Sequence, residues 1–208
     1  MFILYSLLMA LAVLLSLPWW LFQMARSKKY RAGLGERLGF VPHRIRASAR
    51  EGSVWVHAVS VGEVLAISNL VRELRNAFPE KSIFISTTTL TGQKLARELF
   101  GESHVFFMPL DFGFAIRSYV NVLRPSLLML AETEFWPNLL HLAKKRGTNI
   151  AVVNGRISDR SFPRYRRFRR LFAPVLACID LFLAQPEKTP SGFVKSERTN
   201  NGSRSAET

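Results

Sequence analysis

The sequence of 208 residues has a single cysteine, Cys178, and only 15 acidic residues against 29 Lys and Arg. One cysteine cannot form an internal disulfide, which excludes a small secreted domain built on disulfides. The hydrophobic fraction of 48% and the aromatic fraction of 12% exclude intrinsic disorder for most of the chain. The length suits one domain, or one domain preceded by an anchor.

The net charge of +14 is concentrated in two segments. Residues 25–50 contain eight Lys or Arg and one Glu, and residues 156–170 contain seven Arg and one Asp. The rest of the chain is nearly neutral in sum. The basic residues therefore form two patches, each able to attract an anionic partner, and not a uniformly basic surface.

Charged side chains are absent from residues 1–25, a run long enough to cross a bilayer as a helix. Trp19 and Trp20 suit an aromatic belt, although Pro18 leaves a shallow interfacial insertion open. A cleavable signal would carry its charge before the apolar run, and none is present there. We predict a membrane anchor over 1–25 and a basic juxtamembrane segment over 26–52, with the following domain kept in the cytoplasm by the cations Arg26, Lys28, Lys29 and Arg31.

The middle of the chain alternates between strand-like and helix-like patterns. Continuous apolar runs are typical of strands that are buried on both faces of a parallel sheet. The predicted strands are Val54–Val59, Ser82–Thr88, His104–Met108, Ser126–Ala131, Asn149–Val153 and Asp180–Ala184. The predicted helices are Glu63–Phe78, Thr91–Phe100, Gly113–Leu123, Trp136–Arg146 and Phe162–Cys178. We predict an α/β domain over 53–185 with a Rossmann-like parallel sheet, whose ligands bind at the carboxyl ends of the strands.

The turn after the first predicted strand contains Ser60, Gly62 and Glu63. Ser60 and Glu63 have the spacing of a capping box that opens the next helix. The same geometry suits a site, because Gly62 allows close approach of a ligand and the positive helix end keeps Glu63 ionised as a proton acceptor. Spacing alone leaves both interpretations open.

Polar residues also follow the next two strands. Of the threonines from Thr87 to Thr91, one is explained by helix capping and two by β-propensity. Asp111 is interpreted as a helix N-cap in preference to a catalytic residue.

The fourth strand is followed by Glu132 and Glu134, two carboxylates beside Trp136 and Pro137. Pro137 suits a first helical turn. The two acids suit a helix N-terminus, but their place at a strand end favours a site.

The fifth strand leads into the arginine-rich segment 156–170. Arginine at the ligand edge of a sheet suits phosphate groups. No nucleic-acid-binding module is recognisable, so with an anchor nearby the phosphate of a lipid is the preferred partner.

Several of these strings resemble one family, the 3-deoxy-D-manno-octulosonic acid (Kdo) transferases. In order along the chain they are YRAGLGERLGF (30–40), VHAVSVGE (56–63), TTTLTG (87–92), AETEFWPN (131–138), NGRISDRS (154–161) and LAQ (183–185). The resemblance implies the N-terminal half of a glycosyltransferase of GT-B architecture at the cell inner membrane. Such enzymes transfer Kdo from CMP-Kdo to the lipid A precursor, with inversion and without a metal or other cofactor, during lipopolysaccharide synthesis.

The resemblance also implies roles for individual residues. Glu63 is the expected general base, and Glu132 the expected stabiliser of the transition state. The acceptor-binding residues that we expect are Ser60, Gly62, Thr88, Thr89, Arg156, Arg160 and Arg164. Position 131 is Ala where the family usually has Met.

Residues 186–208 depart from the family. Their polar composition predicts a disordered tail, where the family continues into a donor-binding domain. We therefore expect a truncated product whose chain alone is inactive. The alternatives are an inactive membrane-bound acceptor-binding fragment, or an unrelated anchored α/β protein whose arginines bind lipid headgroups or nucleic acid.

Overall fold

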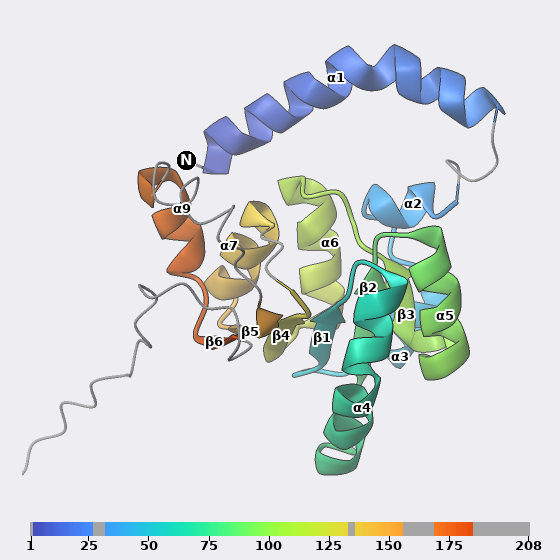
Figure 1. The fold of residues 1–208 in the computed structure, drawn as a ribbon, viewed down its shortest axis with the longest axis vertical. Coiled ribbons are helices and arrows are strands. Elements are labelled where there is room, and N and C mark those ends of the chain that lie inside the picture. Colours follow the sequence, from blue (N-terminus) through green and yellow to red (C-terminus); the bar gives the residue numbers. More distant parts are fainter. Residues whose placement is uncertain (1, 27–31, 133–135, 156–168, 185–208) are drawn as a thin grey trace, which may run out of the picture.

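A computed structural model describes residues 2–26, 32–132, 136–155 and 169–184 (Figure 1). The strands are β1 (Val54–His57), β2 (Ile83–Thr87), β3 (Val105–Phe107), β4 (Leu127–Leu130), β5 (Asn149–Gly155) and β6 (Leu181–Ala184). The helices are α1 (Phe2–Arg26), α2 (Leu34–Arg37), α3 (His43–Ser48), α4 (Val61–Ala77), α5 (Leu90–Phe100), η2 (Glu102–His104), α6 (Gly113–Leu123), α7 (Pro137–Lys145) and α9 (Arg169–Leu176).

The strands form one parallel sheet in the order β3-β2-β1-β4-β5-β6. Each half of the sheet is built outward from its first strand, so that β1 and β4 lie side by side at the centre. In this pair Val54 lies opposite Leu127 and His57 opposite Leu130. The prediction of a Rossmann-like α/β fold with six parallel strands is confirmed.

The sheet is covered on both faces, which explains the continuous apolar runs. Successive side chains of a strand point to opposite faces. In β1, Trp55 packs with residues of α6 and α7, whereas Val54 and Val56 pack with residues of α4 and α5. We call these the α6–α7 face and the α4–α5 face. All four residues of β1 are buried, so the strand cannot alternate between apolar and polar residues.

Residues 32–52 pack against the β3 edge of the sheet. Ile45 of α3 is fully buried in the core of the α6–α7 face. The Glu36 carboxylate pairs with Arg44 at 2.6 Å and accepts a hydrogen bond from the Phe107 backbone N–H at 2.7 Å. The part of the predicted juxtamembrane segment that is described therefore shares the core of the α/β unit. The domain boundary at residue 52 remains a prediction.

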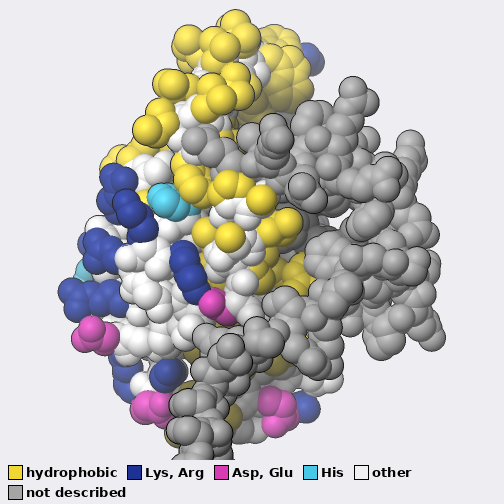
Figure 2. Space-filling view, turned by 90° about the vertical axis from the view of Figure 1, so that its left-hand side faces the viewer, with side chains coloured by type: hydrophobic (Ala, Val, Ile, Leu, Met, Phe, Trp, Pro, Cys, Tyr) yellow, Lys and Arg dark blue, Asp and Glu magenta, His cyan; other side chains and the backbone are white. Residues whose placement is uncertain are grey.

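Helix α1 confirms the prediction of an apolar N-terminal helix. Phe2–Gln23 is long and apolar enough to cross a membrane, and it is not buried in the domain. Its first turn contacts α7: Phe2 stacks on His141 at 4.0 Å, and Asn138 Nδ2 donates to Ser6 Oγ at 3.0 Å. The helix then passes over the end of the domain where α6 and α7 begin (Figure 1). Figure 2 shows its apolar surface, with Lys and Arg side chains in a band below it.

Parts of two predicted elements fall outside the described residues. Of the predicted helix Phe162–Cys178, the structure describes α9 from Arg169 to Leu176. The predicted tail over 186–208 is not among the described residues.

Candidate active site

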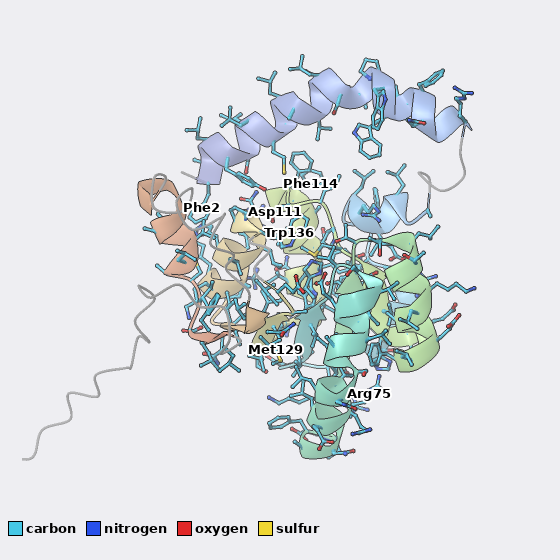
Figure 3. The ribbon with its side chains drawn as sticks, viewed as in Figure 1. Phe2, Arg75, Asp111, Phe114, Met129 and Trp136 are labelled. Atoms are coloured by element: carbon cyan, nitrogen blue, oxygen red, sulfur yellow. The ribbon has the colours of Figure 1, made fainter. Side chains whose placement is uncertain are left out.

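The strand order changes direction between β1 and β4. The chain leaves β1 through α4 toward β2, and leaves β4 through α7 toward β5, so the two connections diverge. In open parallel sheets, ligands bind at such a switch point, outside the carboxyl ends of the strands. Trp136 and Asp111 lie at this end, on the side nearest to α1, while Met129 lies further into the sheet (Figure 3).

The turn between β1 and α4 holds the Glu63 carboxylate in a fixed position. Glu63 Oε2 accepts a hydrogen bond from the Val59 backbone N–H at 2.8 Å, and Oε1 accepts one from Ser60 Oγ at 3.0 Å. Ser60 is the N-cap of α4, but its hydroxyl makes no cap bond to the helix. The two bonds of a capping box are therefore absent, because Glu63 accepts the N–H of Val59 and not that of the N-cap Ser60. Each carboxylate oxygen keeps capacity to accept another proton donor.

The turn between β2 and α5 is bonded to this first turn. The Val59 carbonyl accepts the backbone N–H groups of Thr88 and Thr89, at 3.2 and 3.1 Å, and the Thr89 hydroxyl at 3.2 Å. Thr89 Oγ1 in turn caps α5 by accepting the Gly92 N–H at 3.1 Å. The prediction that capping explains one threonine is confirmed for Thr89.

Gly92 allows the two turns to approach each other. A Cβ atom at this position would lie 2.8 Å from Thr89 Oγ1 and 3.3 Å from the Ser60 carbonyl carbon. At Gly62, by contrast, the nearest atom to an added Cβ would be Ser60 Oγ, at 4.0 Å. Gly62 is exposed, so its missing side chain leaves open space beside Glu63.

The second predicted carboxylate, Glu132, follows β4 directly and is half-buried. The Ala131 N–H donates to the His57 carbonyl at 2.9 Å, which extends the pairing of β4 with β1 up to this residue. The fold therefore places Glu63 and Glu132 after neighbouring strands. Their catalytic roles, and the acceptor-binding roles of Ser60, Gly62, Thr88 and Thr89, remain predictions. Arg156, Arg160, Arg164 and Glu134 lie outside the described residues.

Asp111 is a helix cap, but of a different helix from the one that follows it. The N-cap of α6 is Phe112. Asp111 accepts the backbone N–H groups of Asn138 and Leu139 at 2.9 and 2.8 Å, and so caps α7 from the turn that precedes α6. Burial raises the pKa of Asp111 to about 6, against the opposing effect of these two N–H groups.

Sequence reasoning assigned no role to His57, the last residue of β1. Its ring is buried, with Nδ1 2.9 Å from Ser86 Oγ and 3.2 Å from the Ser86 carbonyl oxygen. Trp136 meets the ring edge-on, with the ring centroids 5.7 Å apart. Desolvation lowers the pKa of His57 to about 4. A polar residue at the end of an otherwise apolar strand is the signal that could have identified it.

The described residues contain no group of three or more His, Cys, Asp or Glu side chains that could hold a metal ion. The expectation of a metal-free site remains a prediction.

The fold and the polar residues at the switch point define a Rossmann-like α/β protein with a candidate site between β1 and β4. Comparison with known proteins specifies the family. A family model described as "3-Deoxy-D-manno-octulosonic-acid transferase (kdotransferase)" matches residues 32–201. The chain therefore belongs to the Kdo transferase family, and the family resemblance seen in the sequence is confirmed.

Individual relatives agree with this assignment. A 3-deoxy-D-manno-octulosonic acid transferase of Haemophilus influenzae is 36% identical over 161 residues, which are 77% of this chain and 37% of the relative. A protein of the same name from Chlamydia pneumoniae is 32% identical over 193 residues, 91% of this chain and 44% of the relative. A bifunctional glycosyltransferase/methyltransferase of Fusobacterium nucleatum is 38% identical over 140 residues, 66% of this chain and 22% of the relative. The chain thus spans less than half the length of these relatives.

Proposed function

We propose that this chain supplies the acceptor side of a glycosyltransferase that moves Kdo from CMP-Kdo to the lipid A precursor in lipopolysaccharide synthesis. The observation that carries the proposal is the Glu63 carboxylate, held at the switch point by Val59 and Ser60 with capacity left on both oxygens. The names of the relatives support the choice of sugar. We infer that much of the CMP-Kdo site belongs to the part of the relatives that this chain does not cover.

In the proposed reaction, Glu63 acts as the general base. Its carboxylate accepts the proton of an acceptor hydroxyl while that oxygen forms a bond to the anomeric carbon of Kdo. The bond to CMP breaks, CMP leaves with the bonding electrons, and the anomeric configuration inverts. Glu132, after the neighbouring strand, stabilises positive charge that develops on the sugar in the transition state.

The acceptor is proposed to bind through its phosphate groups as well as its sugar. Arg156, Arg160 and Arg164 belong to a segment of seven arginines and one aspartate that follows β5. Guanidinium groups bind phosphate through paired hydrogen bonds, and screening by salt weakens the attraction. Replacement of Arg164, Arg166 and Arg167 by Ala should weaken binding of the bisphosphorylated precursor far more than binding of its dephosphorylated form. Equal losses of affinity for the two lipids would show that these arginines bind the membrane surface in general and not the phosphates of the precursor.

We further propose that α1 anchors the chain in the cell inner membrane with the α/β unit in the cytoplasm. The support is its uncharged, unburied apolar surface and the cations that follow it in the sequence. The intact chain should remain with membranes after washing with high salt or carbonate. Release into the soluble fraction would contradict the anchor.

The central experiment separates transfer from binding. Residues 1–184 would replace the matched region of the Haemophilus influenzae relative, and the chimera would be assayed for transfer of labelled Kdo from CMP-Kdo to the lipid A precursor. Binding of the same lipid by the 208-residue chain would be measured in parallel. We expect transfer by the chimera and binding by the chain. Binding without transfer would favour an acceptor-binding module, and absence of both would overturn the proposed function.

A further inference from the structure

Three buried polar atoms near the candidate site have no hydrogen-bond partner in the structure. They are His57 Nε2, Thr88 Oγ1 and Trp136 Nε1. His57 ends β1, Thr88 follows β2, and Trp136 follows β4, and these three strands are neighbours in the sheet. An unpaired buried polar group typically costs about 1–3 kcal/mol, so three at one edge call for polar partners, either ordered water or the polar group of a ligand.

The partners of His57 Nδ1 determine what Nε2 can do. The Ser86 hydroxyl already accepts a hydrogen bond from the Trp55 indole N–H at 2.8 Å. The Ser86 carbonyl, 3.2 Å from His57 Nδ1, can only accept. We take Nδ1 to carry the ring hydrogen of the neutral imidazole, because a lone pair at Nδ1 would face this carbonyl oxygen, and Nε2 then presents a lone pair. Burial lowers the pKa of His57 to about 4, which keeps the ring neutral at pH 7.

Trp136 supplies the opposite hydrogen-bonding group. Its indole N–H can only donate. Its backbone is held in place by the Leu140 N–H, which donates to the Trp136 carbonyl at 3.0 Å, in a helix whose first turn Asp111 caps. The ring lies edge-on to His57, at an interplanar angle of 83°. The rings that carry this acceptor and this donor thus lie next to each other on the α6–α7 face.

A hydroxyl group matches this pair. It donates one hydrogen, which His57 Nε2 can accept, and accepts another from the Trp136 indole. A carboxylate has no hydrogen to offer to Nε2, and an ammonium group has no lone pair for the indole. The two side chains are also uncharged at pH 7, so they form no ion pair with a charged ligand.

We propose that His57 and Trp136 form a specificity subsite for one sugar hydroxyl of the acceptor, on the α6–α7 face of the switch point. The proposal rests on the proposed function, because it takes the acceptor to be a sugar. β1 then positions two parts of the site. Its last residue, His57, binds one hydroxyl of the acceptor, and the turn that follows it presents Glu63 to the reacting hydroxyl. Entry of the hydroxyl requires the Trp136 ring to turn away from His57, which breaks no hydrogen bond of the indole.

A matched pair of substitutions separates the two ring nitrogens. His57→Asn places a polar atom near the position of Nδ1 and removes Nε2, whereas His57→Gln places one near Nε2. Binding of the lipid A precursor by the 208-residue chain in detergent micelles is the readout. We expect His57→Asn and Trp136→Phe each to weaken binding at least tenfold, and His57→Gln to weaken it less than threefold. If both His57 variants bind like the wild type, the subsite is overturned.

The double variant His57→Asn/Trp136→Phe tests whether both groups hold the same hydroxyl. Two groups that bind one hydroxyl lose their contributions together, so the double variant should bind about as weakly as either single variant. If the fold-losses in lipid affinity of the two single variants multiply in the double variant, His57 and Trp136 act independently, and the shared subsite is overturned.

A second measurement does not depend on the folding of any variant. The wild-type chain would be tested with lipid analogues that each lack one sugar hydroxyl. We expect one analogue to bind at least tenfold more weakly, because without that hydroxyl the lipid cannot form the hydrogen bonds to His57 and Trp136. Binding of all analogues within threefold of the parent would overturn the subsite alone. No binding of the parent lipid would overturn the proposed function together with it.

Discussion

The two faces of the sheet differ sharply at the edge where the candidate site lies. On the α4–α5 face, most polar groups of the turns after β1 and β2 bond to one another: Glu63 to Ser60 and Val59, and Thr89 to Val59 and Gly92, with Thr88 Oγ1 as the exception. On the α6–α7 face, His57 and Trp136 each present an unpaired buried atom. Bonded groups are held in a fixed geometry, whereas unpaired ones need a further partner.

The largest expected effect concerns Glu63 on the bonded side. Glu63→Gln keeps the size of the side chain and its reach toward Val59, but removes the basic carboxylate. In the chimeric transferase we expect turnover to fall by ~10²–10⁴, the usual contribution of a general base, with lipid binding nearly unchanged. Glu73→Gln on the same helix, where the side chain is 66% exposed, is the matched control and should retain full turnover. Near-normal turnover of Glu63→Gln would contradict the general base and leave Glu63 only a structural role at the start of α4.

The next effect concerns the pH dependence of stability and arises from His57. Its pKa is about 4 in the folded chain, against 6.5 for an unperturbed histidine. The unfolded chain therefore takes up a proton as pH falls below 6.5, while the folded chain does not, so stability present at pH 7 is lost toward pH 4. This loss should be about 2 kcal/mol between pH 7 and pH 5.

Urea unfolding of wild type and His57→Gln at both pH values checks this loss. Asp111, whose pKa is raised to about 6, acts in the opposite direction but is present in both proteins. The difference between them therefore isolates His57, and equal pH dependence of the two would show that the ring titrates normally.

A smaller effect should distinguish two glycines beside the site. Gly92→Ala places a Cβ atom 2.8 Å from Thr89 Oγ1 and against the Ser60 backbone, and should destabilise by about 1–3 kcal/mol. Gly62→Ala meets open space in a helix and should raise the free energy of unfolding by up to about 1 kcal/mol. If Gly62 allows close approach of the acceptor, the same substitution should weaken lipid binding although the fold is more stable. Unchanged lipid binding would contradict the prediction that Gly62 belongs to the acceptor-binding site.

The smallest effect concerns the helix cap on the bonded side. Thr89→Ala removes the acceptor for the Gly92 N–H and the hydroxyl bond to Val59. Loss of an N-cap typically costs about 1 kcal/mol, which we expect in thermal or urea unfolding. Thr89→Ser should keep both bonds, and a loss of equal size in that variant would contradict the cap as the cause.

The strands were predictable from the sequence because each is buried on both faces. A run such as residues 54–57 has no polar residue before its end, and such short continuous apolar runs are typical of strands in a covered parallel sheet. Glu63 and Glu132 were singled out by their places after neighbouring strands, and their roles were implied by the family resemblance. The packing of Ile45 and Glu36 against the sheet was not foreseen, since the basic charge around them concealed the contacts that they make across the fold.

By itself, the sequence determined the family, the number of strands and the apolar N-terminal helix, because these follow from local hydrophobicity and from strings of adjacent residues. Only the tertiary structure decided which groups share the site and which of them are bonded. Asp111 caps a helix 27 residues further on, and His57 meets Trp136 from another strand end. Such contacts depend on the order of the strands in the sheet, which brings distant residues together, and no short segment of sequence contains that information.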